Sequence, residues 1–344
     1  MWLSSLDSFE QSRRLHHIAY ALITHSLHMH SKAALIFTAT LLLAAFASSR
    51  AETPVSTTTK LDVTYKTTEQ GPLKLDLHYP AAPKAGAKVP LVLFTHGGGW
   101  AAGTKTIERG VRLMGVKALN AQGFCVASVD YRLCTAGGNI TVRDCVTDAK
   151  DALRFLAKNA MPFSLDAERI FTWGDSAGGH LAQMLLLSPP ESFPGDPTLA
   201  DAKYRLIAGV SWYGPCDFEK IDLFTPPGGS EVRDRFGSRI LKADADEKTK
   251  LAAYREVSPV NYLRPNSPPL LMMQGDQDPT IPVQHAHYMK ERGDAAKAPV
   301  EVLIIQNSGH NWREVGGALR PSLDEIMTKT ADFMKQQLDH GISR

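Results

Sequence analysis

The stretch of sequence that decides the fold runs from Trp173 to His180 and reads W-G-D-S-A-G-G-H. It contains the pattern Gly-x-Ser-x-Gly with Ser176 at its centre. Residues 169–173 before it are apolar and β-prone, and residues 179–187 after it are good helix formers. Glycines on both sides of a serine permit a sharp turn from strand to helix that a β-carbon would obstruct. The sequence therefore predicts that Ser176 is a nucleophile presented on such a turn.

A glycine-rich loop lies upstream of this serine. Residues 89–95 are apolar and strand-like, and they run directly into His96-Gly97-Gly98-Gly99-Trp100. A carbonyl attacked by a serine becomes an oxyanion, which needs hydrogen-bond donors fixed in advance, and backbone N–H groups of glycines can supply them. Three glycines alone would also suit a plain tight turn. Their position before the Gly-x-Ser-x-Gly pattern favours an oxyanion hole.

A nucleophilic serine needs a general base, and the base needs an orienting acid. Downstream of Ser176, the apolar strand 269–274 ends in Gly-Asp276-Gln-Asp278-Pro, and the strand 300–305 leads into a loop that contains His310. Both loops follow the carboxyl ends of strands, where sites in parallel sheets form. His310 is therefore the predicted base. Asp278 is a candidate acid, and Asp276 is another, although its side chain could instead cap the turn.

Other histidines fit the role of base less well. His285 and His287 follow a proline in a predicted helix, where an exposed or packed histidine is the ordinary interpretation, and His340 lies near the C-terminus. Only His310 combines a preceding strand with a surrounding loop.

Strands and helices alternate along the chain, which indicates a mostly parallel, doubly wound α/β sheet with helices on both faces. Residues 61–65 and 73–79 are expected to form an antiparallel opening pair. Further strands are expected near Leu91, Phe124, Ile170, Leu206, Leu270 and Val300, and helices over residues 108–120, 142–159, 177–187, 283–292 and 323–338.

The alternation lapses over residues 216–258, which contain prolines, two adjacent glycines and a charged run. This segment is predicted to be a lid or a substrate-contacting insertion, although a plain solvated helix would have a similar sequence.

Length and composition agree with one large domain over residues 52–344. Hydrophobic residues make up 43% and charged residues 22% of the chain, as in globular proteins. The chain contains 38 Lys and Arg and 36 Asp and Glu, so its net charge is only +2. This charge gives no electrostatic argument for a nucleic-acid partner.

The first 51 residues differ in kind from the rest. Ala33 to Ala47 form an apolar run of 15 residues that follows Lys32. A membrane-spanning helix needs about 20 such residues, so the run fits a secretory signal peptide rather than an integral membrane span. Small residues up to Ala51 offer cleavage sites, and Met29 would begin a signal peptide of ordinary length. We therefore expect residues 1–28 to be an upstream extension, and the mature protein to be secreted or periplasmic.

Export would place the four cysteines in a compartment that permits disulfides. Cys134 and Cys145 flank a glycine-containing loop and are the expected pair. Cys125 lies in an apolar strand and is expected to pack as a small hydrophobic residue. The sequence leaves the connectivity, including that of Cys216, open.

Several motifs together resemble the esterase group of the α/β-hydrolases. They are H-G-G-G-W at 96–100, D-Y-R at 130–132, G-D-S-A-G-G-H-L-A at 174–182, W-Y-G-P at 212–215, S-P-V-N-Y-L at 258–263 and G-D-x-D-P-x-I-P-V at 275–283. The chain is most similar to the branch of feruloyl and acetylxylan esterase-like proteins called BD-FAE, which borders the hormone-sensitive-lipase-like group. The resemblance covers residues 60 to 338 and implies an eight-stranded α/β-hydrolase sheet.

The resemblance also implies site residues. They are a catalytic triad of Ser176, Asp278 and His310, and an oxyanion hole formed by the N–H groups of Gly98, Gly99 and Ala177. His96 is implied to be a structural hydrogen-bonding residue. No metal and no cofactor are expected for this chemistry, and the histidines within residues 1–28 have no carboxylate or cysteine partner at ligand spacing.

The resulting functional hypothesis is a secreted serine carboxylester hydrolase. Its expected substrates are small-molecule or polysaccharide esters of short acyl (acetyl) or hydroxycinnamoyl groups. The alternatives are an amidase, formamidase or peptidase on the same fold, or a non-catalytic binding protein. The sequence does not determine the natural acyl group, the alcohol or the oligomeric state.

Overall fold

The fold is taken from a computed structural model, which describes residues 59–81, 86–135, 138–226, 229, 234–242 and 244–342. The predicted signal peptide, the start at Met29 and the upstream extension lie outside the described residues.

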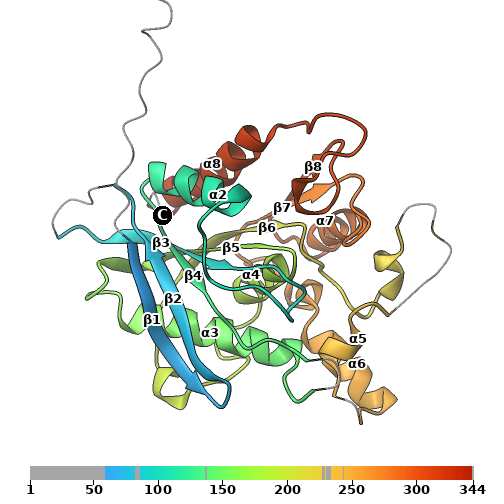
Figure 1. Ribbon diagram of the computed structural model, residues 1–344, viewed down its shortest axis with the longest axis horizontal. Helices are drawn as coiled ribbons and strands as arrows, with labels where there is room; N and C mark the ends of the chain where they lie inside the picture. Colours follow the sequence, from blue (N-terminus) through green and yellow to red (C-terminus); the bar gives the residue numbers. More distant parts are fainter. Residues whose placement is uncertain are drawn as a thin grey trace, which may run out of the picture. The chain divides into compact units, whose positions relative to one another are not determined.

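In the described part of the chain, eight strands form one sheet in the order β1-β2-β4-β3-β5-β6-β7-β8 (Figure 1). β2 runs antiparallel to β1 and β4, whereas the remaining neighbours are parallel. The strands are β1 (Thr59–Thr68), β2 (Gly71–His78), β3 (Val89–Thr95), β4 (Cys125–Val129), β5 (Leu165–Asp175), β6 (Leu206–Trp212), β7 (Leu270–Gly275) and β8 (Val300–Ile305). The predicted mostly parallel α/β sheet with an antiparallel opening pair is confirmed.

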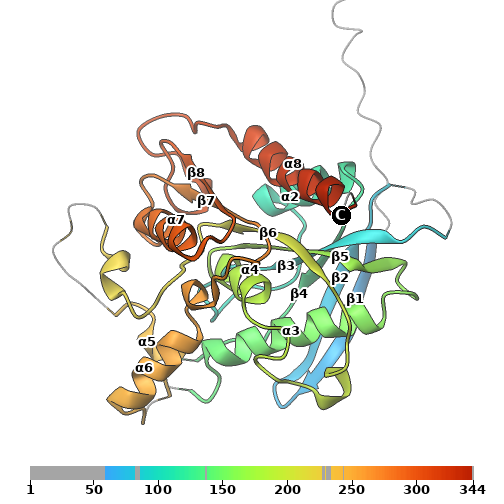
Figure 2. The same cartoon turned by 180° about the vertical axis from the view of Figure 1, so that it is seen from behind.

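Helices cover both faces of this sheet. α2 and α8 lie side by side on one face, and α3 lies on the opposite face (Figures 1 and 2). The five longer helices of the α/β layers are α2 (Gly110–Ala121), α3 (Val142–Lys158), α4 (Ala177–Leu187), α7 (Gln284–Ala296) and α8 (Leu323–Ile342). Each corresponds to a helix expected from the sequence.

The alternation of side chains along the strands explains the two layers. In β3, Val92 and Phe94 belong to the buried cluster that contains residues of α2 and α8. Their neighbours Leu91 and Leu93 belong to the cluster that contains residues of α3. Both faces of a central strand are thus buried, as in parallel sheets covered by helices.

One boundary differs from expectation, because β5 begins at Leu165 rather than near Arg169. Val89 and Pro90 of β3 pair with Leu165 and the residue after it before the register shifts. This pairing between the amino ends of two central strands extends β5 through polar residues whose sequence carries little β signal.

The segment 216–258 forms short helices, η2 (Ile221–Phe224), α5 (Gly237–Ile240) and α6 (Glu247–Glu256). It packs on the glycine-rich loop, because the ring of Trp100 meets those of Phe218 and Phe236 at centroid distances of 5.8 and 5.3 Å. The segment is therefore a folded insertion, and its role as a lid stays a prediction.

The four cysteines are unbonded and buried. The Sγ atoms of the expected pair, Cys134 and Cys145, lie 3.6 Å apart, which is a contact between thiols rather than a disulfide of about 2.05 Å. The predicted disulfide is therefore not present in this structure, although its partners are neighbours. Cys125 is fully buried, which confirms its role as a core residue.

Among the described residues, no helix has the length and apolar character needed to cross a bilayer.

Candidate active site

Ser176 occupies a strained turn between β5 and α4. Its φ and ψ angles are 54° and −119°, and its N–H donates to the Trp212 carbonyl at 2.9 Å. The flanking glycines allow close approach of neighbouring backbone, since a Cβ on Gly174 would lie 2.1 Å from the Gly178 oxygen. A Cβ on Gly178 would lie 1.9 Å from the Thr95 oxygen. The turn therefore requires the glycines that the sequence pattern contains.

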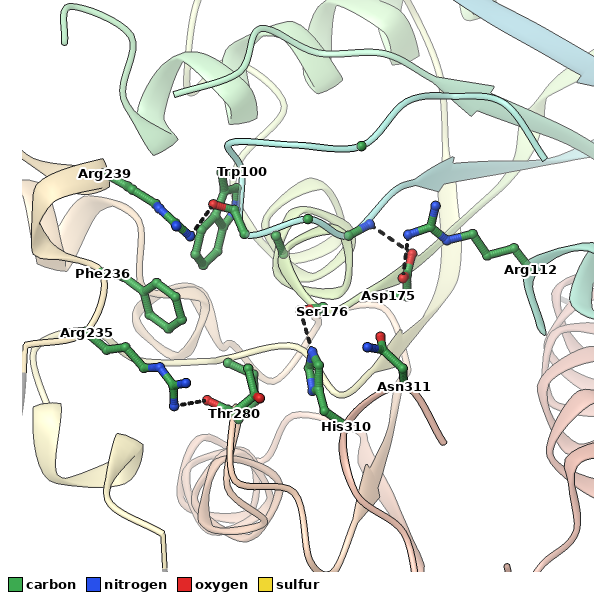
Figure 3. A pocket seen from close by; sticks show the side chains of 16 residues that line it. Trp100, Arg112, Asp175, Ser176, Arg235, Phe236, Arg239, Thr280, His310 and Asn311 are labelled. Carbon is green, nitrogen blue, oxygen red and sulfur yellow. Dashed lines mark hydrogen bonds and ion pairs between the residues drawn. The ribbon is translucent and has the colours of Figure 1, made fainter. Parts of the chain in front are cut away.

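The structure brings Ser176, His310 and Asp278 together. His310 Nε2 lies 2.9 Å from Ser176 Oγ (Figure 3). On the other side of the ring, His310 Nδ1 lies 2.7 Å from Asp278 Oδ2. The three residues follow the carboxyl ends of β5, β7 and β8. This chain of hydrogen bonds has the geometry needed to move a proton from the serine to the histidine.

The two candidate acids have different partners. Besides His310, the Asp278 carboxylate accepts the N–H groups of Thr280 and Ile281 at 2.7 and 3.0 Å and is 2% exposed. Asp276 instead accepts the Ser308 N–H at 3.0 Å and so ties its own loop to the histidine loop. Only Asp278 contacts the histidine.

The other three candidate histidines do not reach Ser176. His285 is buried, its Nδ1 accepts the Cys216 N–H at 3.3 Å, and burial lowers the pKa of its imidazole to about 3. His287 and His340 are exposed on α7 and α8.

The glycine-rich loop lines the same cavity as Ser176 and His310. The cavity has a volume of about 610 Å³, and Gly98, Gly99 and Ala177 belong to its wall. Gly98 has a φ of 127°, and a Cβ there would lie 2.0 Å from the Ala102 carbonyl oxygen. No hydrogen bond among the described residues uses the N–H groups of Gly98, Gly99 or Ala177. These donors are therefore available to a ligand atom beside the serine.

A second carboxylate, which the sequence interpretation missed, connects this loop to the serine turn. Asp175 Oδ1 accepts the Gly97 N–H at 2.9 Å, and Asp175 Oδ2 accepts Arg112 Nη2 at 2.8 Å (Figure 3). The aspartate is 3% exposed, so the pairing with Arg112 compensates a buried charge. Its place inside Gly-Asp-Ser-Ala-Gly was a signal, but nothing in the sequence indicated that α2 would supply the arginine.

A buried histidine links three further segments. Trp100 Nε1 donates to His180 Nδ1 at 3.2 Å, so the other ring nitrogen carries the proton and donates to the Val257 carbonyl at 2.7 Å. The glycine-rich loop, the helix after Ser176 and the end of the insertion are thus held together. His96 is also buried, with Nδ1 2.8 Å from the Gly97 oxygen and its ring stacked on Tyr131.

The insertion contributes three residues to the cavity, namely Arg235, Phe236 and Arg239 (Figure 3). The sequence placed the insertion near substrate but did not single out these side chains. An arginine within a charged surface segment has no pattern that distinguishes it from its solvated neighbours.

A family model, BD-FAE, matches residues 75–292 of this sequence. The chain belongs to the BD-FAE family. The matched range includes Ser176, the glycine-rich loop and Asp278, whereas His310 lies beyond it.

Solved structures show the same fold as this BD-FAE protein. A truncated carbohydrate esterase from gut microbiota superposes with a TM-score of 0.66 at 21% identity, covering 83% of this chain and 98% of the other. Butyrate-bound esterase 2 of Thermogutta terrifontis superposes with a TM-score of 0.62 at 23% identity, covering 83% and 95%. The protein therefore has the α/β-hydrolase fold.

Curated relatives of this BD-FAE protein include named esterases. Esterase LipC of Mycobacterium tuberculosis is 30% identical over 258 residues, which are 72% of this chain and 61% of LipC. Isoprenylcysteine alpha-carbonyl methylesterase ICME of Arabidopsis thaliana is 26% identical over 277 residues, which are 79% of this chain and 61% of ICME. The chain thus spans about three fifths of the length of these relatives.

Proposed function

We propose that this protein is a serine carboxylester hydrolase. The observation that carries the proposal is the continuous set of contacts from Ser176 Oγ through His310 to Asp278, at 2.9 and 2.7 Å. The backbone N–H groups of Gly98, Gly99 and Ala177, which have no described hydrogen-bond acceptor, belong to the wall of the same cavity. The esterase names of the relatives support the same reaction class.

In the first half of the reaction, Ser176 Oγ attacks the ester carbonyl while its proton passes to His310 Nε2. Asp278 keeps Nδ1–H directed at its own carboxylate and stabilises the imidazolium that forms. The carbonyl oxygen becomes an oxyanion that the N–H groups of Gly98, Gly99 and Ala177 stabilise. When the intermediate collapses, the carbon–oxygen bond to the alcohol breaks, and His310 returns the proton to the departing oxygen.

In the second half, water replaces the alcohol. His310 removes a proton from the water as its oxygen attacks the acyl carbon, and the same oxyanion donors stabilise the second intermediate. The bond from the acyl carbon to Ser176 Oγ then breaks, and the serine recovers its proton from His310. The acid leaves, and the site is regenerated without a change in oxidation state.

The substrates we propose are short acyl (acetyl) or hydroxycinnamoyl esters, including those of plant polysaccharides. The cavity of about 610 Å³ suits a small ligand. Structural neighbours are a carbohydrate esterase and an esterase with butyrate or propionate bound, which are short acids.

A substrate series tests this proposal. We expect kcat/KM for p-nitrophenyl esters to be highest for acetyl to butyryl chains and to fall about tenfold or more beyond eight carbons, because longer chains outgrow the cavity. Acetylated xylan and methyl ferulate, measured alongside, report on the alcohol and the hydroxycinnamoyl group. N-formylkynurenine and aminoacyl anilides are the matched amide substrates. A maximum at long acyl chains, or a preference for the amides, would contradict the proposed class.

We also propose that the protein is secreted or periplasmic. The apolar run from Ala33 to Ala47 after Lys32 supports a signal peptide, and a polymeric substrate would be found outside the cell. With its native start codon, the exported protein should begin near Ala51 or Glu52, as N-terminal sequencing of extracytoplasmic material would show. An intact Met1 on protein confined to the cytoplasm would contradict export.

A further inference from the structure

Positive charge gathers at the cavity that contains Ser176. Its wall includes three arginines, Arg112, Arg235 and Arg239, against the single carboxylate of Asp175. Asp175 is already paired with Arg112 at 2.8 Å. The charges of Arg235 and Arg239 therefore remain, in a protein whose total net charge is only +2.

Within the described residues, neither of these two guanidinium groups is paired with an acid. Arg235 Nη1 donates to the carbonyls of Pro279 and Thr280 at 2.9 and 3.2 Å, and Arg239 Nη1 donates to the Gly99 carbonyl at 2.7 Å. These acceptors are neutral. No carboxylate in the described part of the chain lies within 4.0 Å of either group. Only Nη1 of each arginine has a described partner, so Nε and Nη2 are left to bind a ligand.

The described acidic residue next to Arg235 in the sequence is engaged elsewhere. Asp234, the neighbour of Arg235, accepts the Tyr254 hydroxyl and lies 3.7 Å from Lys250 Nζ. It therefore does not neutralise the cavity wall.

The two guanidinium groups are also oriented. Each lies over the ring of Phe236, at 6.0 Å for Arg235 and 5.7 Å for Arg239, and the ring itself lines the cavity (Figure 3). An aromatic ring between two arginines restricts their rotamers, so less conformational entropy is lost when they bind an anion. Planar guanidinium groups suit carboxylates in particular, because two parallel N–H bonds fit the two oxygens.

We propose that the alcohol part of the substrate carries a carboxylate, which Arg235 and Arg239 bind while Ser176 attacks the ester. This inference rests on the proposed function. Arg235 is exposed and Arg239 is half-buried, so both belong to the outer part of the cavity. The alcohol part of a polymeric ester must extend outward past this rim, whereas a short acyl group stays beside the serine. An O-acetylated uronic-acid residue has the required chemistry.

Two matched acetyl esters test the inference. The carboxylate of 4-acetoxybenzoate lies at the far end of the ring from the ester and cannot attack it, and 4-acetoxybenzamide has the same shape without the charge. We expect kcat/KM to be about tenfold or more higher for the anionic ester, the effect of a hydrogen-bonded charge pair. The preference should shrink between about 0.05 M and about 0.5 M NaCl because the cavity rim is open to ions. Acetylated polygalacturonate should likewise be preferred over acetylated xylan.

Variants separate binding from a purely structural role. Arg235→Gln and Arg239→Gln should each lower the ratio of the two kcat/KM values several-fold. If the arginines only hold the Gly99 and Thr280 loops, both esters should slow in proportion and the ratio should stay constant. Arg292→Gln, which removes an exposed charge on α7, is the control and should keep the wild-type ratio.

The outcomes distinguish this inference from the proposed function. Hydrolysis of neither ester by the wild type would overturn the esterase proposal itself. Equal hydrolysis of both esters would leave that proposal intact and overturn the carboxylate site. An anionic preference that both Gln variants retain would assign the preference to other residues and also overturn the site.

Discussion

Replacing Ser176 with alanine is expected to lower kcat for p-nitrophenyl acetate by about five to six orders of magnitude, because it removes the hydroxyl that His310 Nε2 contacts and that would form the acyl-enzyme. The fold should remain, since the change removes one partly exposed hydroxyl and leaves the backbone contacts of the turn in place. Activity and the thermal midpoint would be measured on the same preparation.

Labelling with a fluorophosphonate provides an independent readout. The wild type should bind one equivalent, and Ser176→Ala should bind none. Ser322→Ala, at the start of α8 and away from the cavity, is the matched control and should label normally. An alanine variant that still labels and turns over would show that another nucleophile acts.

The second large effect concerns the two neighbouring aspartates. Asp278→Asn should lower kcat/KM by about four orders of magnitude, because an amide cannot stabilise the imidazolium and favours the wrong tautomer of His310. Asp276→Asn should cost less than about tenfold, since its remaining side-chain oxygen can still accept the Ser308 N–H. Steady-state kinetics on both variants tests the assignment.

The matched histidine pair completes this test. His310→Ala should be nearly as inactive as the serine variant, whereas His287→Ala, exposed on α7, should remain near the wild type. A folded Asp276→Asn protein that is slower than Asp278→Asn would reverse the roles of the two carboxylates.

The sequence predicted the positions of the sheet, the helices and the serine turn because these depend on local patterns. A Cβ at Gly174 or Gly178 would lie 2.1 or 1.9 Å from a neighbouring backbone oxygen, so the residue type at these positions reports directly on geometry. The neighbourhood of His310 and Asp278 was predictable because parallel strands place their carboxyl ends along one edge. Sequence spacing could not distinguish the roles of Asp276 and Asp278, because these roles depend on which neighbouring residue each carboxylate contacts in the folded protein.

The residues that were missed depend on contacts between distant segments. Arg112 reaches Asp175 from α2, and Arg235 and Arg239 reach the cavity from the insertion. None of the three lies in a periodic or motif-like stretch, so their sequence resembles that of ordinary surface arginines. The start of β5 was missed for the same reason, because pairing with Val89 rather than β propensity extends it to Leu165.

The hydrogen-bonded His180 has a consequence for acid tolerance. Both ring nitrogens are committed in the neutral form, and burial lowers the pKa of His180 to about 4. In the unfolded chain a histidine has a pKa of about 6.5, so between that pH and the folded-state pKa the unfolded state binds a proton that the folded state does not bind. The free energy of unfolding should therefore fall by about 1.4 kcal/mol per pH unit for this residue between pH 6.5 and 4, which urea titrations at pH 7 and 5 can measure. A proton on Nδ1 would remove the acceptor for the Trp100 N–H, whereas Nε2–H would still donate to the Val257 carbonyl, so acid should release the glycine-rich loop from α4 while the insertion stays attached to it.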